Sequence, residues 1–423
     1  MRTVSFITLG CKVNQYETEA MEEKFVQSGY KVQGPDDLSD IYVINTCTVT
    51  NLSDRKSRQM IRKCRRNNEG AIVVVVGCLA QTAPQDVEEM EEVDIIIGTT
   101  GKMDVVDAVE EFDGSKKARV ESLKEVEFEE MKVSKIEDRT RANIKIQDGC
   151  NQFCSYCIIP YARGRIRSRD INNIREEALR IREQGYKEIV LTGIHVASYG
   201  KDLGDIALID VIEEVATIEG IERIRLSSIE ESALTNEFLE RGRTTGKLTD
   251  HFHISLQSGS DTVLKRMNRK YNTREYKDTV ERVRKFFPDA GITTDIIVGF
   301  PEETEEEFQE SFNFCKEVNF SKIHIFPYSM RKGTPATKMK QVDSRVKKER
   351  AKRLSLLEEE LRYAFMDSFV GKDLEVLFER EVDGVSDGLS SNYIRVEKEA
   401  INISNEIMKV SIKNRINDKL RGI

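Results

Sequence analysis

Short apolar runs alternate with helical patterns over the first 112 residues. The apolar runs predict strands at Val4–Leu9, Ile41–Asn45, Ile72–Val76 and Asp94–Ile97. The amphipathic patterns predict helices at Tyr16–Ser28, Ser53–Asn67, Gln85–Glu92 and Lys102–Phe112. This alternation favours an open parallel sheet with helices packed on its faces.

A second alternation begins at Arg141, after a charged, weakly patterned stretch (Asp113–Asp138) that is expected to be a linker or an extended crossover. Strands are predicted at Asn143–Ile146, Glu188–Leu191, Arg223–Leu226, Phe252–Leu256, Thr293–Val298 and Lys322–Phe326. Six β/α units of this size indicate a complete or partial barrel of the triosephosphate-isomerase type. Chemistry in such barrels collects at the C-terminal ends of the strands.

The pattern changes again near the C-terminus. A helix is predicted at Ser344–Phe365, with leucines spaced three and four residues apart. Strand-like segments follow at 374–378, 393–396 and 407–412, and Gly384 and Gly388 are expected to mark turns. A small all-β barrel is the natural interpretation. The fold class is therefore α/β, in three predicted domains at 1–131, 132–367 and 368–423.

Composition narrows the class of protein. Of 423 residues, 39% are hydrophobic and 33% are charged, which is typical of a globular chain of two or three domains. No run approaches the roughly 20 apolar residues of a membrane span, and Met1–Leu9 resembles a strand more than a signal peptide. We therefore expect a cytoplasmic protein with no membrane partner. The net charge of −8 argues against a uniformly basic nucleic-acid binder but allows a local basic surface.

Eight cysteines in a reducing compartment favour metal or redox chemistry over disulfides. Cys64 and Cys315 fall inside helical patterns and are expected to be small buried residues. Three others form a Cys-x3-Cys-x2-Cys constellation just after the first strand of the second region: Cys150, Cys154 and Cys157. Three thiolates in one loop can ligate three irons of a [4Fe–4S] cube and leave the fourth iron open. The alternative, structural zinc, normally needs four protein ligands, and no fourth lies nearby in the sequence.

This constellation resembles the signature of the radical S-adenosylmethionine superfamily. The resemblance implies that the open iron binds S-adenosylmethionine, whose cleavage gives a 5′-deoxyadenosyl radical, and that Tyr156 lies near the adenine. Further cofactor contacts are predicted where successive barrel strands end: Gly193, Glu230, Gln257 and Asp295. Taken singly, each is equally well a turn glycine or a solvated polar group. His195 also falls at a strand end, with its role left open between ligation, proton transfer and packing.

Three more cysteines stand at the ends of three strands in the first region: Cys11, Cys47 and Cys78. Open α/β sheets place ligand sites at this edge, so a second three-thiolate cluster is the sharper hypothesis against three unrelated structural cysteines. The segments Gly10–Gln15, Asn45–Val49 and Gly77–Gln81 resemble the N-terminal domain of the methylthiotransferases. The order of domains, ending in the β-barrel called TRAM, is also theirs.

The methylthiotransferase resemblance covers essentially the whole chain. It implies that the second cluster presents sulfur to a substrate radical and that a second S-adenosylmethionine supplies the methyl group. It also implies an electron-donor protein such as flavodoxin or ferredoxin and a sulfur source. No catalytic residue is predicted beyond the two clusters. Glu231 and Glu302 depart from the family pattern, which commonly has Pro and Gly at these positions.

The family modifies adenosines beside the tRNA anticodon or an aspartate of a ribosomal protein. Basic residues favour RNA: predicted contacts are Arg55, Lys56, Arg58 and Arg62 on one helix, and Arg163 and Arg165 in a segment of alternating arginines. A solvated charged face is the alternative for both runs. Asn392-Tyr393 resembles the branch that acts on N6-threonylcarbamoyladenosine, where Tyr393 would stack on a base or pack in the barrel. The alternatives are isopentenyladenosine, the ribosomal-protein aspartate, and a non-catalytic RNA-binding protein with a structural metal.

Overall fold

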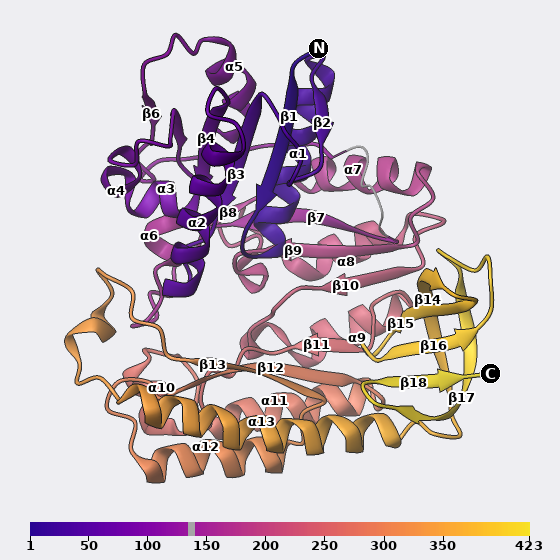
Figure 1. Cartoon of the computed structure of the whole chain (residues 1–423). Coiled ribbons are helices and arrows are strands. Elements are labelled where there is room, and N and C mark those ends of the chain that lie inside the picture. The colour runs from indigo at the N-terminus through magenta and orange to yellow at the C-terminus, as the bar shows by residue number, and fades with distance from the viewer. Residues whose placement is uncertain (134–139) are drawn as a thin grey trace.

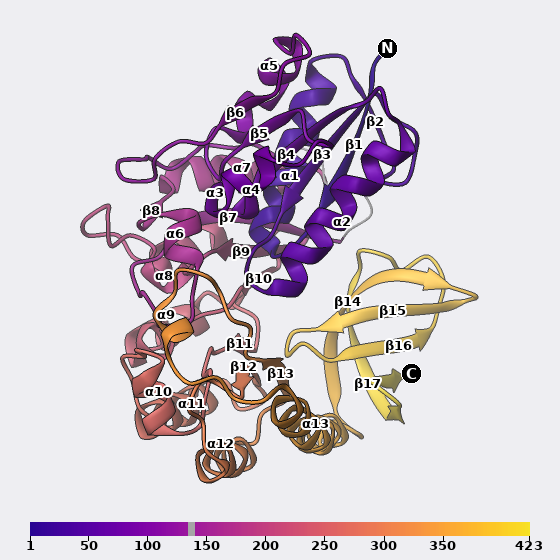
Figure 2. The ribbon, with the colours of Figure 1, turned by 60° about the vertical axis from the view of Figure 1, so that its left-hand side comes forward.

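The computed structural model describes residues 1–133 and 140–423. Three units follow one another along the chain: an N-terminal α/β unit, a central β/α unit and a small C-terminal β-barrel (Figure 1). Figure 2 shows the C-terminal barrel to one side of the central unit, at the end of the long helix α13 (Ser344–Asp367). The predicted fold class is confirmed.

The N-terminal unit is a six-stranded parallel sheet in the order β2-β1-β3-β4-β5-β6. Its strands are β1 (Thr3–Thr8), β2 (Lys31–Gln33), β3 (Ile41–Thr46), β4 (Ile72–Gly77), β5 (Ile95–Ile97) and β6 (Lys117–Arg119). The helices are α1 (Lys12–Gln27), α2 (Asn51–Asn67), α3 (Cys78–Thr82), α4 (Pro84–Glu88), the 3₁₀ turn η1 (Lys102–Asp104) and α5 (Val105–Glu110). Strands β3 and β4 are buried throughout, which explains their continuous apolar runs.

Strand β6 was missed by the sequence pattern. Lys117–Arg119 lies in the stretch predicted to be a linker, yet it pairs with β5 at the edge of the sheet. An edge strand carries charged residues that conceal its strand character. The end of that predicted linker falls at residues 134–138, outside the described residues.

The central unit is a partial barrel built from two strand groups in the orders β10-β9-β7-β8 and β11-β12-β13. Its strands are β7 (Arg141–Asp148), β8 (Arg167–Ser168), β9 (Glu188–Gly193), β10 (Arg223–Leu226), β11 (His251–His253), β12 (Gly291–Val298) and β13 (Lys322–Pro327). Single parallel bridges, Ile224 to Leu248 and Ile229 to Ile254, join the two groups. All six predicted strands are present; β8 is an added antiparallel strand beside β7.

Helices cover the outer faces of these strands (Figures 1 and 2). They are α6 (Ile159–Arg163), α7 (Ile171–Glu183), α8 (Leu208–Ala216), α9 (Asn236–Thr244), α10 (Asp261–Arg266), α11 (Thr273–Phe286) and α12 (Glu305–Val318), with the 3₁₀ turns η2 (Val196–Ser198), η3 (Glu231–Ala233) and η4 (Pro335–Lys338). Capping boxes start α11 and α12, where Asn272 pairs with Glu275 and Thr304 with Glu307. Cys64 in α2 and Cys315 in α12 are buried, as predicted.

The C-terminal unit is a closed barrel in the order β14-β15-β16-β18-β17. Its strands are β14 (Asp373–Val382), β15 (Val385–Ser390), β16 (Arg395–Glu399), β17 (Ile407–Ile416) and β18 (Lys419–Gly422). Gly384 occupies the predicted turn with φ +79°. The turn predicted at Gly388 is wrong, because Gly388 lies within β15. A Cβ there would be 2.4 Å from the Leu377 carbonyl oxygen, so glycine permits close strand approach.

Buried ion pairs fix the N-terminal unit on the barrel. The Arg163 guanidinium at the end of α6 pairs with Glu17 of α1 and lies 3.2 Å from Asp148. Lys102 and Lys145 pair with the same Glu17 carboxylate. Burial opposes ionisation of Glu17, but these cations outweigh it and hold its pKa well below the usual range. Within the described ranges, no helix is long and apolar enough to span a bilayer.

Candidate active site: two cysteine trios at one cavity

A cavity of about 790 Å³ lies where the three units meet. The N-terminal unit contributes Cys11, the barrel contributes the Cys150–Cys157 loop and the C-terminal barrel contributes Tyr393. All four histidines of the chain line it: His195, His251, His253 and His324. One cysteine of the predicted N-terminal cluster, Cys11, and all three cysteines of the other therefore face one space.

The loop between β7 and α6 positions Cys150, Cys154 and Cys157 on the cavity wall. Gly149 begins this loop with φ +72°, and a Cβ there would be 1.8 Å from the Arg165 carbonyl oxygen, so only glycine fits. Burial raises the pKa of Cys150 to about 11 and that of Cys157 to about 12. As free thiols these groups hold their protons at neutral pH, and a metal would replace the protons on binding.

Donors directed at sulfur make this loop suitable for anionic thiolates. The Arg269 guanidinium lies 3.3 Å from the Cys154 sulfur, and the backbone N–H of Gln152 lies 3.4 Å from the Cys150 sulfur. Both are donor contacts that stabilise bound thiolates. The residues present therefore fit the iron–sulfur cluster that the sequence motif predicts.

The second trio comes from three separate strand ends. Cys11 precedes α1, Cys47 follows β3 and Cys78 opens α3 after β4. Gly10 has φ +108°, and a Cβ there would be 2.9 Å from the Cys47 sulfur, so this glycine lets two cysteine-bearing turns approach. Burial, with a smaller contribution from the neighbouring Cys78 and Cys11, raises the pKa of Cys47 to about 11. The sheet topology thus gathers the three predicted ligands.

The separation of the sulfur atoms argues against a single ion in either trio. A tetrahedral zinc with Zn–S bonds of about 2.3 Å would hold its sulfurs about 3.8 Å apart. In the part of the chain that the structure describes, no three cysteines place their sulfurs within 4.8 Å of one another. A larger cluster, ligated by three thiolates, suits both trios better than zinc.

All five residues predicted to contact S-adenosylmethionine line the cavity: Tyr156, Gly193, Glu230, Gln257 and Asp295. Glu230 is the best supported of these. Its carboxylate lies 2.6 Å from His195 Nε2, 3.0 Å from the Arg269 guanidinium and 2.9 Å from the Gln152 amide nitrogen. Burial disfavours the charged form, but the hydrogen bond from His195 and the charge of the Arg269 guanidinium outweigh it and lower the pKa of Glu230. Glu230 is thus a fixed acceptor beside the Cys150 loop.

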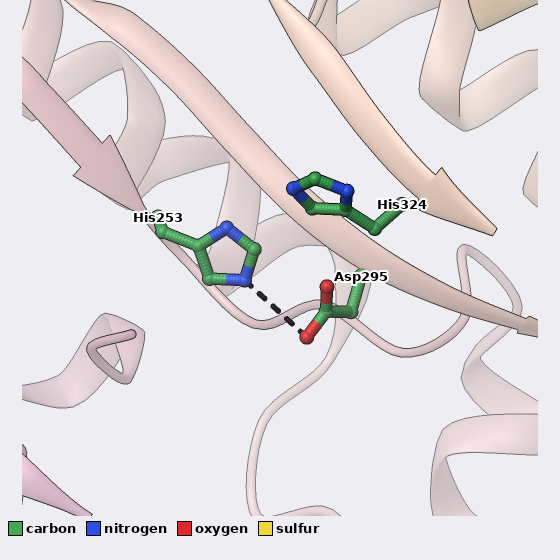
Figure 3. Close-up of side chains that lie close together, drawn as sticks. All are labelled: His253, Asp295 and His324. Atoms are coloured by element: carbon green, nitrogen blue, oxygen red, sulfur yellow. Dashed lines mark ion pairs between the residues drawn. The ribbon is translucent and has the colours of Figure 1, made fainter. Parts of the chain in front are cut away.

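Asp295 belongs to a second polar cluster on β11, β12 and β13. Its carboxylate lies 3.3 Å from His253 Nε2, and His324 of the next strand turns toward both groups (Figure 3). Thr293 links His253 to His251, with its hydroxyl 2.9 Å from His253 Nδ1 and 3.0 Å from His251 Nε2. Burial lowers the pKa of His324 and holds that of His251 well below its usual range. These side chains form a polar wall of the cavity.

Sequence reasoning missed several residues of the cavity wall. Arg269 follows α10 and carries no spacing signal, because its partners come from distant loops. His251 and His253 lie two residues apart on one strand, so strand periodicity would have placed them on one face.

The structure also shows the surroundings of Glu231 and Glu302, the two residues that depart from the family pattern. Glu302 has φ +66°, a conformation that the family's glycine adopts without strain, and burial raises the pKa of Glu231.

The predicted RNA contact at Arg163 is wrong. Its guanidinium is fully buried in the ion pairs with Glu17 and Asp148. Arg167 and Arg169 of the same alternating run are also buried. Only Arg165 is exposed, with its guanidinium 4.9 Å from the centre of the Phe153 ring. The run bends through the end of α6 and β8, so it never presents one continuous basic face.

The helix predicted to contact RNA, α2, has a mixed surface. Arg58 lies 3.0 Å from Asp86 and Arg62 lies 3.5 Å from Glu92, so both charges are partly neutralised. Arg55 and Lys56 are exposed and have no ion pair among the described residues. The start of α2 is held by Arg331, whose guanidinium lies 2.7 Å from Asp54.

Models of two known protein families match this chain. The Radical SAM superfamily matches residues 144–315, and an uncharacterized family, UPF0004, matches residues 3–98. A curated protein of Bacillus subtilis (strain 168) is 44% identical over 97% of this chain and 94% of its own length. It is named threonylcarbamoyladenosine tRNA methylthiotransferase MtaB.

The chain belongs to the radical S-adenosylmethionine methylthiotransferases.

Other relatives divide between two names. The MtaB protein of Aquifex aeolicus (strain VF5) is 40% identical to this methylthiotransferase over 97% of the chain and 100% of the relative. A tRNA-2-methylthio-N(6)-dimethylallyladenosine synthase of Acetivibrio thermocellus is 36% identical over 90% of the chain and 80% of the relative. Family membership implies an iron–sulfur cluster and S-adenosylmethionine.

Solved structures support the fold of the methylthiotransferase. The radical S-adenosylmethionine methyltransferase TsrM from Kitasatospora setae, with tryptophan and a cofactor analogue bound, matches with a TM-score of 0.57. The match covers 90% of this chain and 79% of TsrM at 14% identity. At that identity the likeness shows the fold alone.

Proposed function

We propose that this enzyme methylthiolates C2 of N6-threonylcarbamoyladenosine at position 37, next to the tRNA anticodon. The observation that carries the proposal is the shared cavity, where Cys11 and the Cys150–Cys157 loop face one another across one space. A base held there would lie within reach of Cys11 on one side and of the Cys150–Cys157 loop on the other. The naming of the two MtaB relatives, at 44% and 40% identity, favours this adenosine over the dimethylallyl form.

The two cysteine trios hold two [4Fe–4S] clusters in this proposal, and each turnover consumes two S-adenosylmethionine molecules. When bound, the cluster at Cys150, Cys154 and Cys157 supplies the electron that cleaves the cofactor, and the cluster at Cys11, Cys47 and Cys78 supplies the sulfur. A flavodoxin- or ferredoxin-like protein provides electrons in the cytoplasm, and a separate source replaces the sulfur.

The chain's own residues hold the cofactor. Glu230, kept ionised by His195 and Arg269, accepts from the cofactor's ammonium or a ribose hydroxyl. Tyr156 packs beside Phe300, with ring centres 6.4 Å apart, and shields the adenine from water. Gly193 and Gln257 also line this part of the cavity, and Asp295 offers a second carboxylate.

The anticodon stem-loop binds across the mouth of the cavity. Arg55 and Lys56 of α2 and Arg165 beyond α6 are exposed cations that would contact phosphates. Arg58 and Arg62 contribute less because acidic neighbours already pair with them.

Mass spectrometry of tRNA nucleosides from a deletion strain tests the substrate. The proposal predicts that 2-methylthio-threonylcarbamoyladenosine disappears and returns when the gene is restored. Persistence of this nucleoside, with loss of 2-methylthio-dimethylallyladenosine instead, would show that the enzyme acts on the other adenosine. If both methylthio nucleosides persisted, the result would favour a ribosomal-protein aspartate as the substrate.

A further inference from the structure

Lys12 and Tyr393 stand between the cysteine cavity and a second pocket of about 370 Å³. Both residues line both spaces. The second pocket is polar and includes Arg141 of β7 and Arg395 of the C-terminal barrel. Figure 2 shows the end of the C-terminal barrel that carries the β15–β16 connection turned toward the central strands. Lys12 and Tyr393 thus belong to the wall that the two spaces share.

The Lys12 ammonium is unusual in this setting. The residue is exposed, and among the described residues it has neither an ion pair nor a hydrogen bond, whereas two nearby arginines are paired. Arg141 lies 2.7 Å from Glu379, and Arg225 lies 2.6 Å from Glu188. An accessible cation on a cavity wall, with no counter-charge of its own, is available to pair with an anionic ligand.

Tyr393 is held rigidly beside this charge. Its backbone has φ +73°, and its ring stacks on His251 with centres 4.1 Å apart and planes inclined by 11°. The Arg225 guanidinium lies over the same ring at 5.2 Å. Burial alone would raise the pKa of Tyr393, but Lys12, Arg141, Arg225 and Lys322 together lower it. The phenol of the C-terminal unit therefore lies in a positive field produced by cations of the other two units.

The position of Lys12 favours one anion over another. It directly follows Cys11, so it lies beside the reacting edge of any base that faces this trio. The C2 carbon and the N6 substituent share the Watson–Crick side of adenine. In the threonylcarbamoyl group a carbonyl joins the threonine amine to N6 and leaves the threonine carboxylate free, whereas a dimethylallyl group carries no charge. A backbone phosphate is the competing anion, but it would lie at the mouth of the cavity with α2.

We propose that Lys12, assisted by the Tyr393 hydroxyl, binds the carboxylate of the threonylcarbamoyl group and thereby selects the modified adenosine. This inference rests on the proposed function. Binding of the correct nucleotide would neutralise Lys12. A neutral N6 substituent would leave the ammonium desolvated without a partner, which is how a polar site rejects an apolar analogue.

Binding of three synthetic anticodon stem-loops to the full, anaerobically reconstituted chain tests this proposal. The RNAs carry threonylcarbamoyladenosine, its uncharged threoninamide analogue, or isopentenyladenosine at position 37. For the wild type, fluorescence anisotropy is expected to show about tenfold or greater preference for the carboxylate over the amide, the worth of one charged hydrogen bond. Lys12→Met is expected to reduce that ratio to about twofold or less, and Lys12→Arg to restore part of it.

Lys56→Met provides the matched control, because Lys56 is an exposed lysine at the phosphate-binding face. It is expected to weaken all three RNAs equally and leave the carboxylate-to-amide ratio intact. An unchanged ratio in Lys12→Met, or equal weakening of all three RNAs as in Lys56→Met, would overturn the inference and leave the proposed substrate standing. If the wild type shows no preference for the carboxylate and no turnover of that RNA, the proposed function itself fails.

Discussion

The two cysteine trios, of which one contributes Cys11 to the cavity and the other all three members, are assembled in different ways. Cys150, Cys154 and Cys157 lie in one loop, whose shape depends on Gly149 and a few neighbouring residues. Cys11, Cys47 and Cys78 come from the ends of three parallel strands and meet only when the sheet has formed. The first site is encoded locally and the second by topology. The second trio should therefore be more sensitive to changes in the fold.

The largest effect is expected from a substitution in the Cys150–Cys157 loop. Cys154→Ala removes a thiolate that also interacts with Arg269, so this variant should lose cofactor cleavage and methylthiolation together. Chromatography of 5′-deoxyadenosine, with iron analysis, measures both. Cys315→Ala is the matched control, since Cys315 is buried in α12 away from the cavity. Retention of cleavage in Cys154→Ala would show that the loop is not the radical site.

Breaking the topological site should separate the two activities. Cys78→Ala is expected to lose about half of the iron and all methylthio product, yet still to cleave S-adenosylmethionine, because the Cys150 loop remains intact. Nucleoside mass spectrometry and 5′-deoxyadenosine measurement on the same sample provide the comparison. If cleavage were lost as well, the two trios would not have separate roles.

The next prediction concerns the buried ion pairs that join the N-terminal unit to the central unit. Arg163→Met leaves Glu17 with fewer partners in a fully buried site, which should cost about 3–5 kcal/mol of unfolding free energy. Arg165→Met, on the exposed neighbour, should change it by less than about 0.5 kcal/mol. Anaerobic guanidinium unfolding distinguishes the two variants. Equal stability of both would mean that the buried network does not hold the units together.

The smallest effect concerns the histidine wall. Burial keeps His251 neutral in the folded chain, whereas the unfolded chain binds a proton there below about pH 6.5. The contribution of neutral His251 to the unfolding free energy should therefore be complete above about pH 6.5. It should decrease as the pH falls toward 5, by at most about 1.4 kcal/mol per pH unit. His251→Gln should make that decline less steep. An identical slope in both proteins would show that His251 titrates normally when folded.

The sequence predicted the parts of the fold that hydrophobic pattern encodes. Strand β3 was expected at Ile41–Asn45 and extends to Thr46, because fully buried parallel strands are continuous apolar runs. Strand β6 escaped notice because its charged residues lie at a sheet edge. The partial barrel followed from six repeated strand–helix units, and the C-terminal barrel from alternation and turn glycines.

Site prediction failed where distant partners decide a residue's role. Arg163 resembled an RNA contact because its acidic partner, Glu17, lies far away in the sequence. No role was predicted for Lys12, although it follows Cys11. It lines the cavity because α1 begins at this residue. Spacing located the cysteines because metal ligation restricts residue type, whereas ion pairs and cavity walls place no comparable restriction on local sequence.

Mössbauer spectroscopy of the full chain, reconstituted anaerobically with ⁵⁷Fe, tests the central claim most directly. Two [4Fe–4S] clusters, each with three thiolate ligands, correspond to about eight irons per chain, and added S-adenosylmethionine should perturb the spectrum of one cluster by binding its open iron. Cys154→Ala and Cys78→Ala should each reduce the total to about four irons, and only the Cys78 variant should retain the response to S-adenosylmethionine. A single cluster in the wild type, or loss of the response in both variants, would contradict the account.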